Sequence, residues 1–412
     1  MSTLPCRQNR LAAALLLWAA ATTAGAFGRQ PIAVEVRETA GIRRFQYPVA
    51  AEVLLPEAIS PDSQFRLTRE GQPALLQARP AESGDTALRW RLDFPVDLLP
   101  YETLIYRLEY GGDVPAGPQR KLGLSLTRSD DGFRIANEPH IAWNVPADLS
   151  RLLSSVRGGE MEYLSPDSSG LMILDRDGKE HRLGGANGPA PAVSVSREGP
   201  LAVGLRFAFS DIDPALAEVR STVDLVFPVF KSWVEVDWRI EDPQDRLSGA
   251  KAMLHLNLDA PTRPSPTLVD FGAGTLVYLS LSPGRHAQLI GGSSPWQVLR
   301  GTTDRMEPFV TGARQVDDSP WPEGWAHVMD RRRCLALAAD GFAANGEDRI
   351  DVSAEGAVGL YRHFRAGEQG EETRERRLHF WPHFIPFPPQ QTAATSPQAM
   401  QNPILVHCGA AR

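Results

Sequence analysis

Cysteine is scarce in this sequence of 412 residues, which contains only three. Cys6 lies in an N-terminal segment that we expect to be removed, which leaves Cys334 and Cys408. Two cysteines without CxxC spacing cannot supply the ligands of a structural zinc site, so no metal is expected. The pair could form a disulfide that ties the C-terminus to a strand, or remain as one buried thiol and one thiol in a frayed tail.

An excess of positive charge and the common catalytic signatures are also missing. The formal net charge is −7, which disfavours nucleic acid or an anionic membrane as a partner. It does not exclude a local basic pocket that binds an acidic sugar. There is no GxSxG elbow, no P-loop, no GxGxxG after a strand, no HExxH and no EF-hand loop, and no cofactor is expected. All-β carbohydrate enzymes are not excluded, because their catalytic groups come from separate strands.

Long apolar runs are absent except near the N-terminus. Arg7 and Arg10 precede an apolar stretch over residues 11–21, which is too short to span a bilayer. Ala24 and Ala26 then form a small-x-small cleavage site. We expect a signal peptide over residues 1–26 and an exported, periplasmic or extracellular protein without membrane insertion. An uncleaved anchor is the alternative.

The mature sequence is rich in alternation with a period of two. Residues 88–94, 233–240 and 251–258 place apolar side chains on one face and mostly polar ones on the other, as half-buried strands do. Helical patterns are confined to residues 146–156 and 213–219, which are too short for crossovers between parallel strands. The pattern therefore predicts an all-β fold of antiparallel sheets.

Turn-rich composition between residues 112 and 132 predicts a domain boundary. Strands before it are short, as in a small barrel, and those after it are longer, as in a large sandwich. We expect a small β-barrel over residues 27–128, a large antiparallel β-sandwich over 129–390 and a C-terminal tail over 391–412.

The predicted strand with the most candidate functional side chains lies near the C-terminus. His379, Trp381 and His383 are two residues apart and should share one face. An indole between two imidazoles suits a sugar ring, and a histidine there could act as a base or a metal ligand. The alternative is an ordinary edge strand, since Pro382 removes one ladder hydrogen bond.

A neighbouring run places Tyr361 and His363 on one face. If a hairpin loop over residues 365–377 joins this run to the C-terminal strand, tyrosine and histidines gather on one sheet. Such a group could perform β-elimination on a uronic acid, with an arginine such as Arg362 neutralising the carboxylate. The alternative is that these histidines cluster because the strand is half exposed.

A third candidate is the segment that contains Trp325 and His327, which three arginines follow at residues 331–333. Aromatic rings beside arginines could bind an acidic saccharide. The simpler interpretation is that residues 330–333 form a solvated hairpin tip.

Several short motifs resemble the exo-acting rhamnogalacturonan lyase and YetA-like family. They lie at residues 47–49, 54–57, 65–67, 88–94, 106–110, 174–180, 198–201, 233–236, 324–326 and 395–403. The resemblance implies an N-terminal RIFT-type barrel followed by a β-supersandwich, and an acidic, pectin-like polysaccharide or oligosaccharide as partner. Full-length family members continue into a helical toroid domain, which this sequence does not reach.

Three hypotheses follow for the function. The first is a non-catalytic glycan-binding or scaffold module related to these lyases. The second is a polysaccharide lyase that cleaves acidic glycans by β-elimination. The third is a structural protein of the cell envelope.

Overall fold

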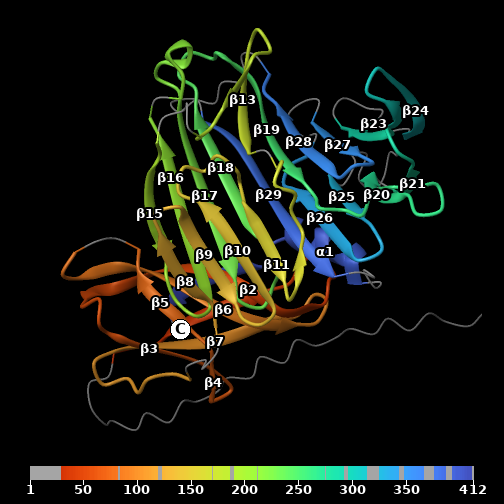
Figure 1. Ribbon diagram of the computed structural model, residues 1–412. Helices are drawn as coiled ribbons and strands as arrows, with labels where there is room; N and C mark the ends of the chain where they lie inside the picture. The colour runs from red at the N-terminus through yellow and green to blue at the C-terminus, as the bar shows by residue number, and fades with distance from the viewer. Residues whose placement is uncertain are drawn as a thin grey trace, which may run out of the picture.

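The computed structural model describes residues 29–410 apart from eleven short gaps (Figure 1). The gaps are residues 82–83, 119–122, 169, 186–189, 211, 274, 292–295, 313–323, 343–347, 366–374 and 387–391. The expected signal peptide lies outside the described residues. No helix within the described ranges is long and apolar enough to cross a membrane.

The N-terminal unit consists of two antiparallel sheets. One has the order β30 (Leu405–Ala410), β1 (Ile32–Arg37), β7 (Thr103–Gly111), β3 (Gln64–Arg69), β4 (Gln72–Ala74). The other has the order β2 (Arg44–Ile59), β6 (Ala87–Leu98), β5 (Gln77–Pro80). Trp90, Leu92 and Phe94 of β6 are buried in its core, which confirms the predicted alternation over these positions. Leu88, expected on the same face, is instead 40% exposed, because the pairing of β6 with β2 shifts register at this end of the strand.

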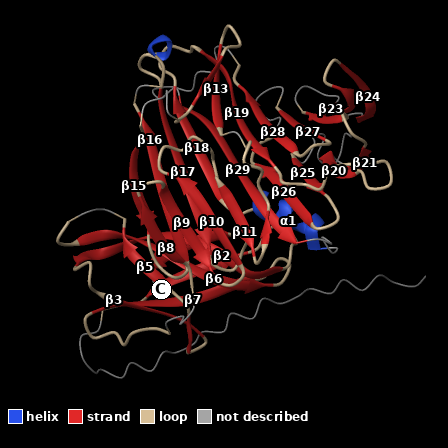
Figure 2. Ribbon diagram, viewed as in Figure 1, coloured by secondary structure: helices blue, strands red, loops and turns tan. Residues whose placement is uncertain are grey.

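The larger unit is a sandwich of antiparallel sheets (Figure 2). The nine-stranded sheet has the order β15 (Ala192–Arg197), β16 (Ala202–Phe209), β17 (Arg220–Pro228), β18 (Glu235–Glu241), β29 (Glu375–Pro386), β26 (Arg333–Ala339), β25 (Trp325–Met329), β20 (Thr267–Ala273), β21 (Thr275–Leu281). The eight-stranded sheet has the order β14 (Glu180–Arg182), β13 (Leu171–Asp175), β19 (Leu247–His255), β28 (Ala357–His363), β27 (Arg349–Ser353), β22 (His286–Ile290), β23 (Trp296–Thr302), β24 (Arg305–Gly312).

A third sheet covers part of the same core. Its order is β12 (Met161–Glu162), β11 (Ser155–Gly158), β10 (Ile141–Pro146), β9 (Gly132–Asn137), β8 (Ser125–Ser129). Trp143 of this sheet contacts Phe227 of β17, and both side chains are fully buried. The fold is thus all-β with multiple antiparallel sheets, as the period-two pattern predicted.

The helix predictions are less accurate. Residues 146–156 form turns that lead into β11, so the predicted helix is wrong there. Residues 213–219 contain only a single 3-10 turn, Pro214–Leu216, which the Asp213 side chain caps. The one α-helix of the described residues, α1 (Thr392–Gln401), lies in the expected C-terminal tail. Beyond it, β30 pairs with β1 and so returns the chain to the N-terminal unit.

The N-terminal unit lies against the outer face of the nine-stranded sheet, below the sandwich in Figure 1. Trp233, Trp325 and Trp381 project from that face into the same apolar cluster as the N-terminal strands. Helix α1 adds Met400, which is buried in this cluster. A buried aromatic junction therefore fixes the position of the sandwich relative to the N-terminal unit.

Both remaining cysteines are free thiols, so the disulfide interpretation is wrong. Cys334 is buried in β26, whereas Cys408 is partly exposed in β30. Burial raises the pKa of each thiol, which keeps them in the unreactive protonated form.

Candidate functional site

Strand β29 has the faces that its sequence predicts. Phe380 and Phe384 point into the sandwich core, while His379, Trp381 and His383 lie on the opposite face. Trp381 packs on the imidazole of His379, with ring centroids 4.2 Å apart. This face does not form an open platform, because the N-terminal unit covers it and leaves Trp381 only 6% exposed.

His383 is partly buried in the junction. Its ring meets the indole of Trp233 edge-on, with centroids 5.5 Å apart. Burial lowers the pKa of His383 to about 3, so the ring is neutral under ordinary conditions. Its role is therefore packing within the junction.

The predicted gathering of Tyr361 and His363 with the β29 residues on one sheet is wrong. β28 pairs with β19 and β27 in the eight-stranded sheet, whereas β29 pairs with β18 and β26 in the nine-stranded sheet. Leu360 and Phe380 show the reason, since both are buried in the same core. Two strands that each have an apolar face can satisfy it by facing each other across a sandwich instead of pairing.

Tyr361 lies on the outer face of the eight-stranded sheet. The guanidinium of Arg349 lies 4.1 Å from the centroid of its ring and the ammonium of Lys251 lies 5.0 Å away. These are the residues directly opposite Tyr361 on the two neighbouring strands. The phenol is thus part of a cross-strand cation–π row.

Arg362 points the opposite way and is buried between the sheets. It forms an ion pair of 3.0 Å with Asp348 and donates hydrogen bonds to the backbone carbonyls of Asp340 and Gly341. Its guanidinium holds the loop after β26 in place and is already engaged by these partners.

Trp325 and His327 of β25 are both buried. Their rings are 4.9 Å apart, and Nδ1 of His327 lies 3.4 Å from a carboxylate oxygen of Asp270. Trp325 belongs to the aromatic junction. Trp325 and His327 therefore form no exposed sugar platform. The predicted hairpin tip is present between β25 and β26, where Arg331 and Arg332 are exposed, although Asp330 and Arg333 at its base are buried.

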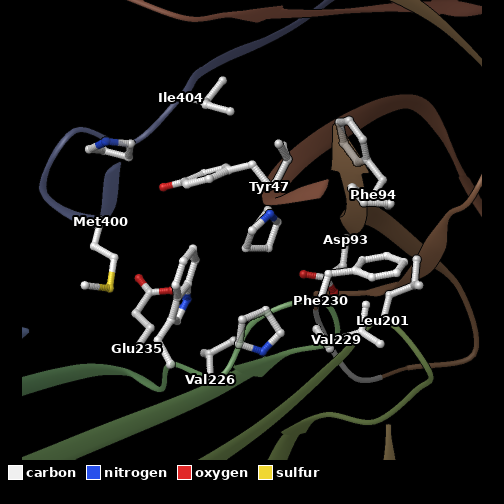
Figure 3. Close-up of a pocket in the computed structure, with 18 of the residues that line it drawn as sticks. Tyr47, Asp93, Phe94, Leu201, Val226, Val229, Phe230, Glu235, Met400 and Ile404 are labelled. Carbon is white, nitrogen blue, oxygen red and sulfur yellow. The ribbon is translucent and has the colours of Figure 1, made fainter. Parts of the chain in front are cut away.

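A cavity of about 240 Å³ lies between the two units, and we call it the junction cavity (Figure 3). Three parts of the chain supply most of its walls: strands β2 and β6, strands β18 and β29, and the segment from α1 to β30. Residues at the ends of β15, β16 and β17 complete them. Figure 3 shows Tyr47, Phe94, Glu235 and Met400 around the same space although they come from these three parts of the chain. Its principal polar and aromatic lining residues are Tyr47, Asp93, Arg197, Trp233, Glu235, Asp340, His379 and Trp381.

His379 is the central polar group of this cavity. Its Nε2 lies 3.0 Å from Oε1 of Glu235 and its Nδ1 lies 3.4 Å from Oδ2 of Asp340. Burial alone would lower the pKa of His379, but the hydrogen bonds to Asp340 and Glu235 outweigh it and raise this pKa to about 9. At neutral pH the ring is an imidazolium that bridges two carboxylates.

His379 in turn stabilises the ionised forms of Glu235 and Asp340. Burial would raise the pKa of the Glu235 carboxyl, but the hydrogen bond and charge of His379 hold it below its usual range. The hydrogen bond from His379 likewise lowers the pKa of Asp340. Both groups are therefore ionised acceptors at neutral pH.

A second cavity, of about 270 Å³, is also lined by His379. Its polar lining residues are Asp340, Arg362, His363, Glu375, Arg376, Arg377 and His379. His363 and His379 thus border one space although their strands belong to different sheets. Arg377 forms an ion pair of 2.6 Å with Asp237, and Arg376 one of 3.0 Å with Asp245.

No protein-family model and no curated protein matches the chain. Among solved structures, it is similar to a protein in glycosyl hydrolase family 38 from Enterococcus faecalis, with a TM-score of 0.55, 11% identity and coverage of 93% of this chain and 48% of that chain. An alpha-mannosidase from Enterococcus faecalis V583 gives a TM-score of 0.52 and 12% identity, with coverage of 92% and 46%. The chain spans about half the length of these proteins. At such low identity the likeness shows the fold alone.

Most residues of the junction cavity carry no signal in the sequence that marks them as neighbours. Glu235 lies on the polar face of the alternating residues 233–240, and that position was the only signal for it. Asp93 occupies the equivalent place in the pattern of β6, but nothing in the sequence indicated that it would face Arg197 from the other unit at 2.9 Å. Asp340 follows β26 in a turn that carries no motif.

Proposed function

We propose that the protein is an exported glycan-binding module without catalytic activity, related to the rhamnogalacturonan lyases, and that its ligand enters the junction cavity. The observation that carries this proposal is the convergence of Trp381, His379 and Glu235 on one cavity. An indole offers an apolar face to the C–H groups of a sugar, and the charged groups beside it accept or donate hydrogen bonds to hydroxyls. The fold gives weaker support by analogy, since the similar structures are named as glycosidases.

The charge distribution around His379 supports an acidic polysaccharide or oligosaccharide as the partner. Arg376 and Arg377 line the second cavity, and each has further N–H groups beyond its ion pair with Asp245 or Asp237, whereas Arg362 is engaged by Asp348. Arginine binds carboxylates through two parallel hydrogen bonds. A uronate unit next to the junction cavity would meet this basic surface.

Binding without cleavage is favoured by the protonation of His379. A base for β-elimination must be unprotonated and within reach of the substrate proton. His379 is held as an imidazolium between two carboxylates, and Tyr361 lies in the other sheet. Neither His379 nor Tyr361 is therefore placed to act at this cavity as the base that the sequence suggested.

Titration of the protein with pectin-derived and other polyuronate oligosaccharides tests the proposal, with calorimetry and tryptophan fluorescence as readouts. Trp381→Phe, which keeps much of the packing, and His379→Gln should each weaken binding about tenfold, the effect of losing about 1.4 kcal/mol. The matched control is His407→Gln on β30, where the side chain is exposed. Equal binding by all four proteins would show that the ligand does not enter the junction cavity.

The same incubations distinguish the lyase alternative. A lyase produces an unsaturated sugar that absorbs in the ultraviolet, so a rise in absorbance that scales with protein concentration would refute the non-catalytic role. Export is checked separately by fractionating the producing cells and determining the N-terminal residue of the mature protein, which should be Phe27.

A further inference from the structure

The polar groups of the junction cavity have unequal capacity for new hydrogen bonds. Both ring nitrogens of His379 are directed at carboxylates, and Arg197 Nη1 donates to Asp93 at 2.9 Å. The hydroxyl of Tyr47 donates to the backbone carbonyl of Ala399 at 2.9 Å. These donors are therefore engaged within the protein before any ligand arrives.

The acceptors are in the opposite situation. An ionised carboxylate has about four lone-pair sites, and His379 uses one oxygen of Glu235 and one of Asp340. Their side chains are 41% and 50% exposed, so a ligand can reach them. The cavity therefore presents two neighbouring anionic acceptors, held on either side of one imidazolium.

Charge and size restrict the ligand further. Asp93 is compensated by ion pairs with both Arg79 and Arg197, whereas the carboxylates of Glu235 and Asp340 share the single cation of His379. Glu235, His379 and Asp340 together have a net negative charge, and a single unit charge repels a further carboxylate at about 4 Å by about 1–4 kcal/mol. The volume of about 240 Å³ is below the range of about 300–1,000 Å³ that is common for drug-sized ligands. One sugar ring suits such a space better than a longer glycan does.

We propose that the junction cavity binds a single neutral sugar ring, through two hydroxyls that donate to Glu235 and Asp340, and that it discriminates against a ring that carries a carboxylate. This inference rests on the glycan-binding function proposed above and specifies which unit of the glycan enters the cavity. Trp381 and Trp233 provide the apolar surface for the ring. In a glycan with both kinds of unit, the acidic one remains outside the cavity.

Matched pairs of methyl glycosides test this directly. In each pair the neutral hexoside and the hexuronide differ only at C6, and gluco, galacto and manno pairs cover the common configurations. Saturation-transfer NMR and calorimetry with the full-length protein provide the dissociation constants. One neutral hexoside should bind at least tenfold more tightly than its uronide. A deoxy analogue of that hexoside that lacks either donating hydroxyl should bind about tenfold more weakly than the hexoside itself.

Variants assign this preference to the two acceptors. Glu235→Gln and Asp340→Asn keep the shape of each side chain but remove one negative charge. Each variant should therefore show a smaller difference between the dissociation constants of the hexoside and the uronide. His407→Gln should leave that difference unchanged.

The possible results distinguish the preference for a neutral sugar ring from the glycan-binding function on which it rests. A uronide that binds as tightly as its neutral partner overturns the inference. The inference also falls if no simple glycoside binds while polyuronate binding persists and still depends on His379, but then the proposed function stands. Absence of binding to every glycan overturns both.

Discussion

Protonated His379 should stabilise the folded protein over a defined range of pH. Its pKa of about 9 lies above the ordinary value of 6.5, so the folded state binds this proton more tightly than the unfolded state does. The stabilisation is complete below pH 6.5 and is lost as the pH rises through about 9. The difference between these two pKa values corresponds to about 3 kcal/mol of folding free energy. Solvent screens the exposed partner carboxylates, which reduces the expected stabilisation to about 1–2 kcal/mol.

Urea denaturation of the wild type and of His379→Gln at pH 6 and pH 10 measures the effect. The free energy of unfolding of the wild type should fall by about 1–2 kcal/mol more than that of the variant between the two pH values. Comparison with the variant cancels the contribution of other groups, among them Lys231, whose pKa burial lowers to about 8. NMR of the His379 ring gives the titration itself. A midpoint at or below 6.5, or parallel pH profiles for the two proteins, would refute this account of the bridged imidazolium.

Three further predictions concern stability. A methyl group at Gly272 would overlap with the indole of Trp325, so Gly272→Ala should cost about 1–3 kcal/mol in urea denaturation, whereas Gly112→Ala, which meets no atom within 4 Å, should be close to neutral. Arg44 pairs with buried Glu38 and donates to two backbone carbonyls of the C-terminal segment, so Arg44→Met should cost about 3–5 kcal/mol; a loss below 1 kcal/mol in the same assay would contradict the pairing. A reducing agent should leave the melting temperature in calorimetry unchanged, because both described cysteines are free thiols.

Local pattern predicted the strands and their faces well. In residues 233–240 the apolar positions are the buried ones, because one face of β18 covers the sandwich core and the period of a strand is two. The same rule placed His379, Trp381 and His383 together on the outer face of β29. These predictions succeed because each depends only on residues that are neighbours in the sequence.

Features that depend on distant segments were not predicted. Whether β28 joins the sheet of β29 is decided by its pairing with β19 and β27, which lie elsewhere in the sequence. The covering of Trp381 by the N-terminal unit has the same origin. Glu235 and Asp340 are brought to His379 by the order of strands in the nine-stranded sheet, and no periodicity within one segment encodes that order.

The pairing of β1 with β30 has a consequence for biosynthesis. β1 is the first of the described strands to emerge from the ribosome, whereas its neighbour β30 is the last of them to be translated. Pairing β1 with β30 closes a loop that contains the whole sandwich, which is slow and entropically costly. One edge of β1 therefore stays unpaired while the sandwich forms. An edge of this kind invites pairing with other chains, and protection by a chaperone would be most valuable during that interval.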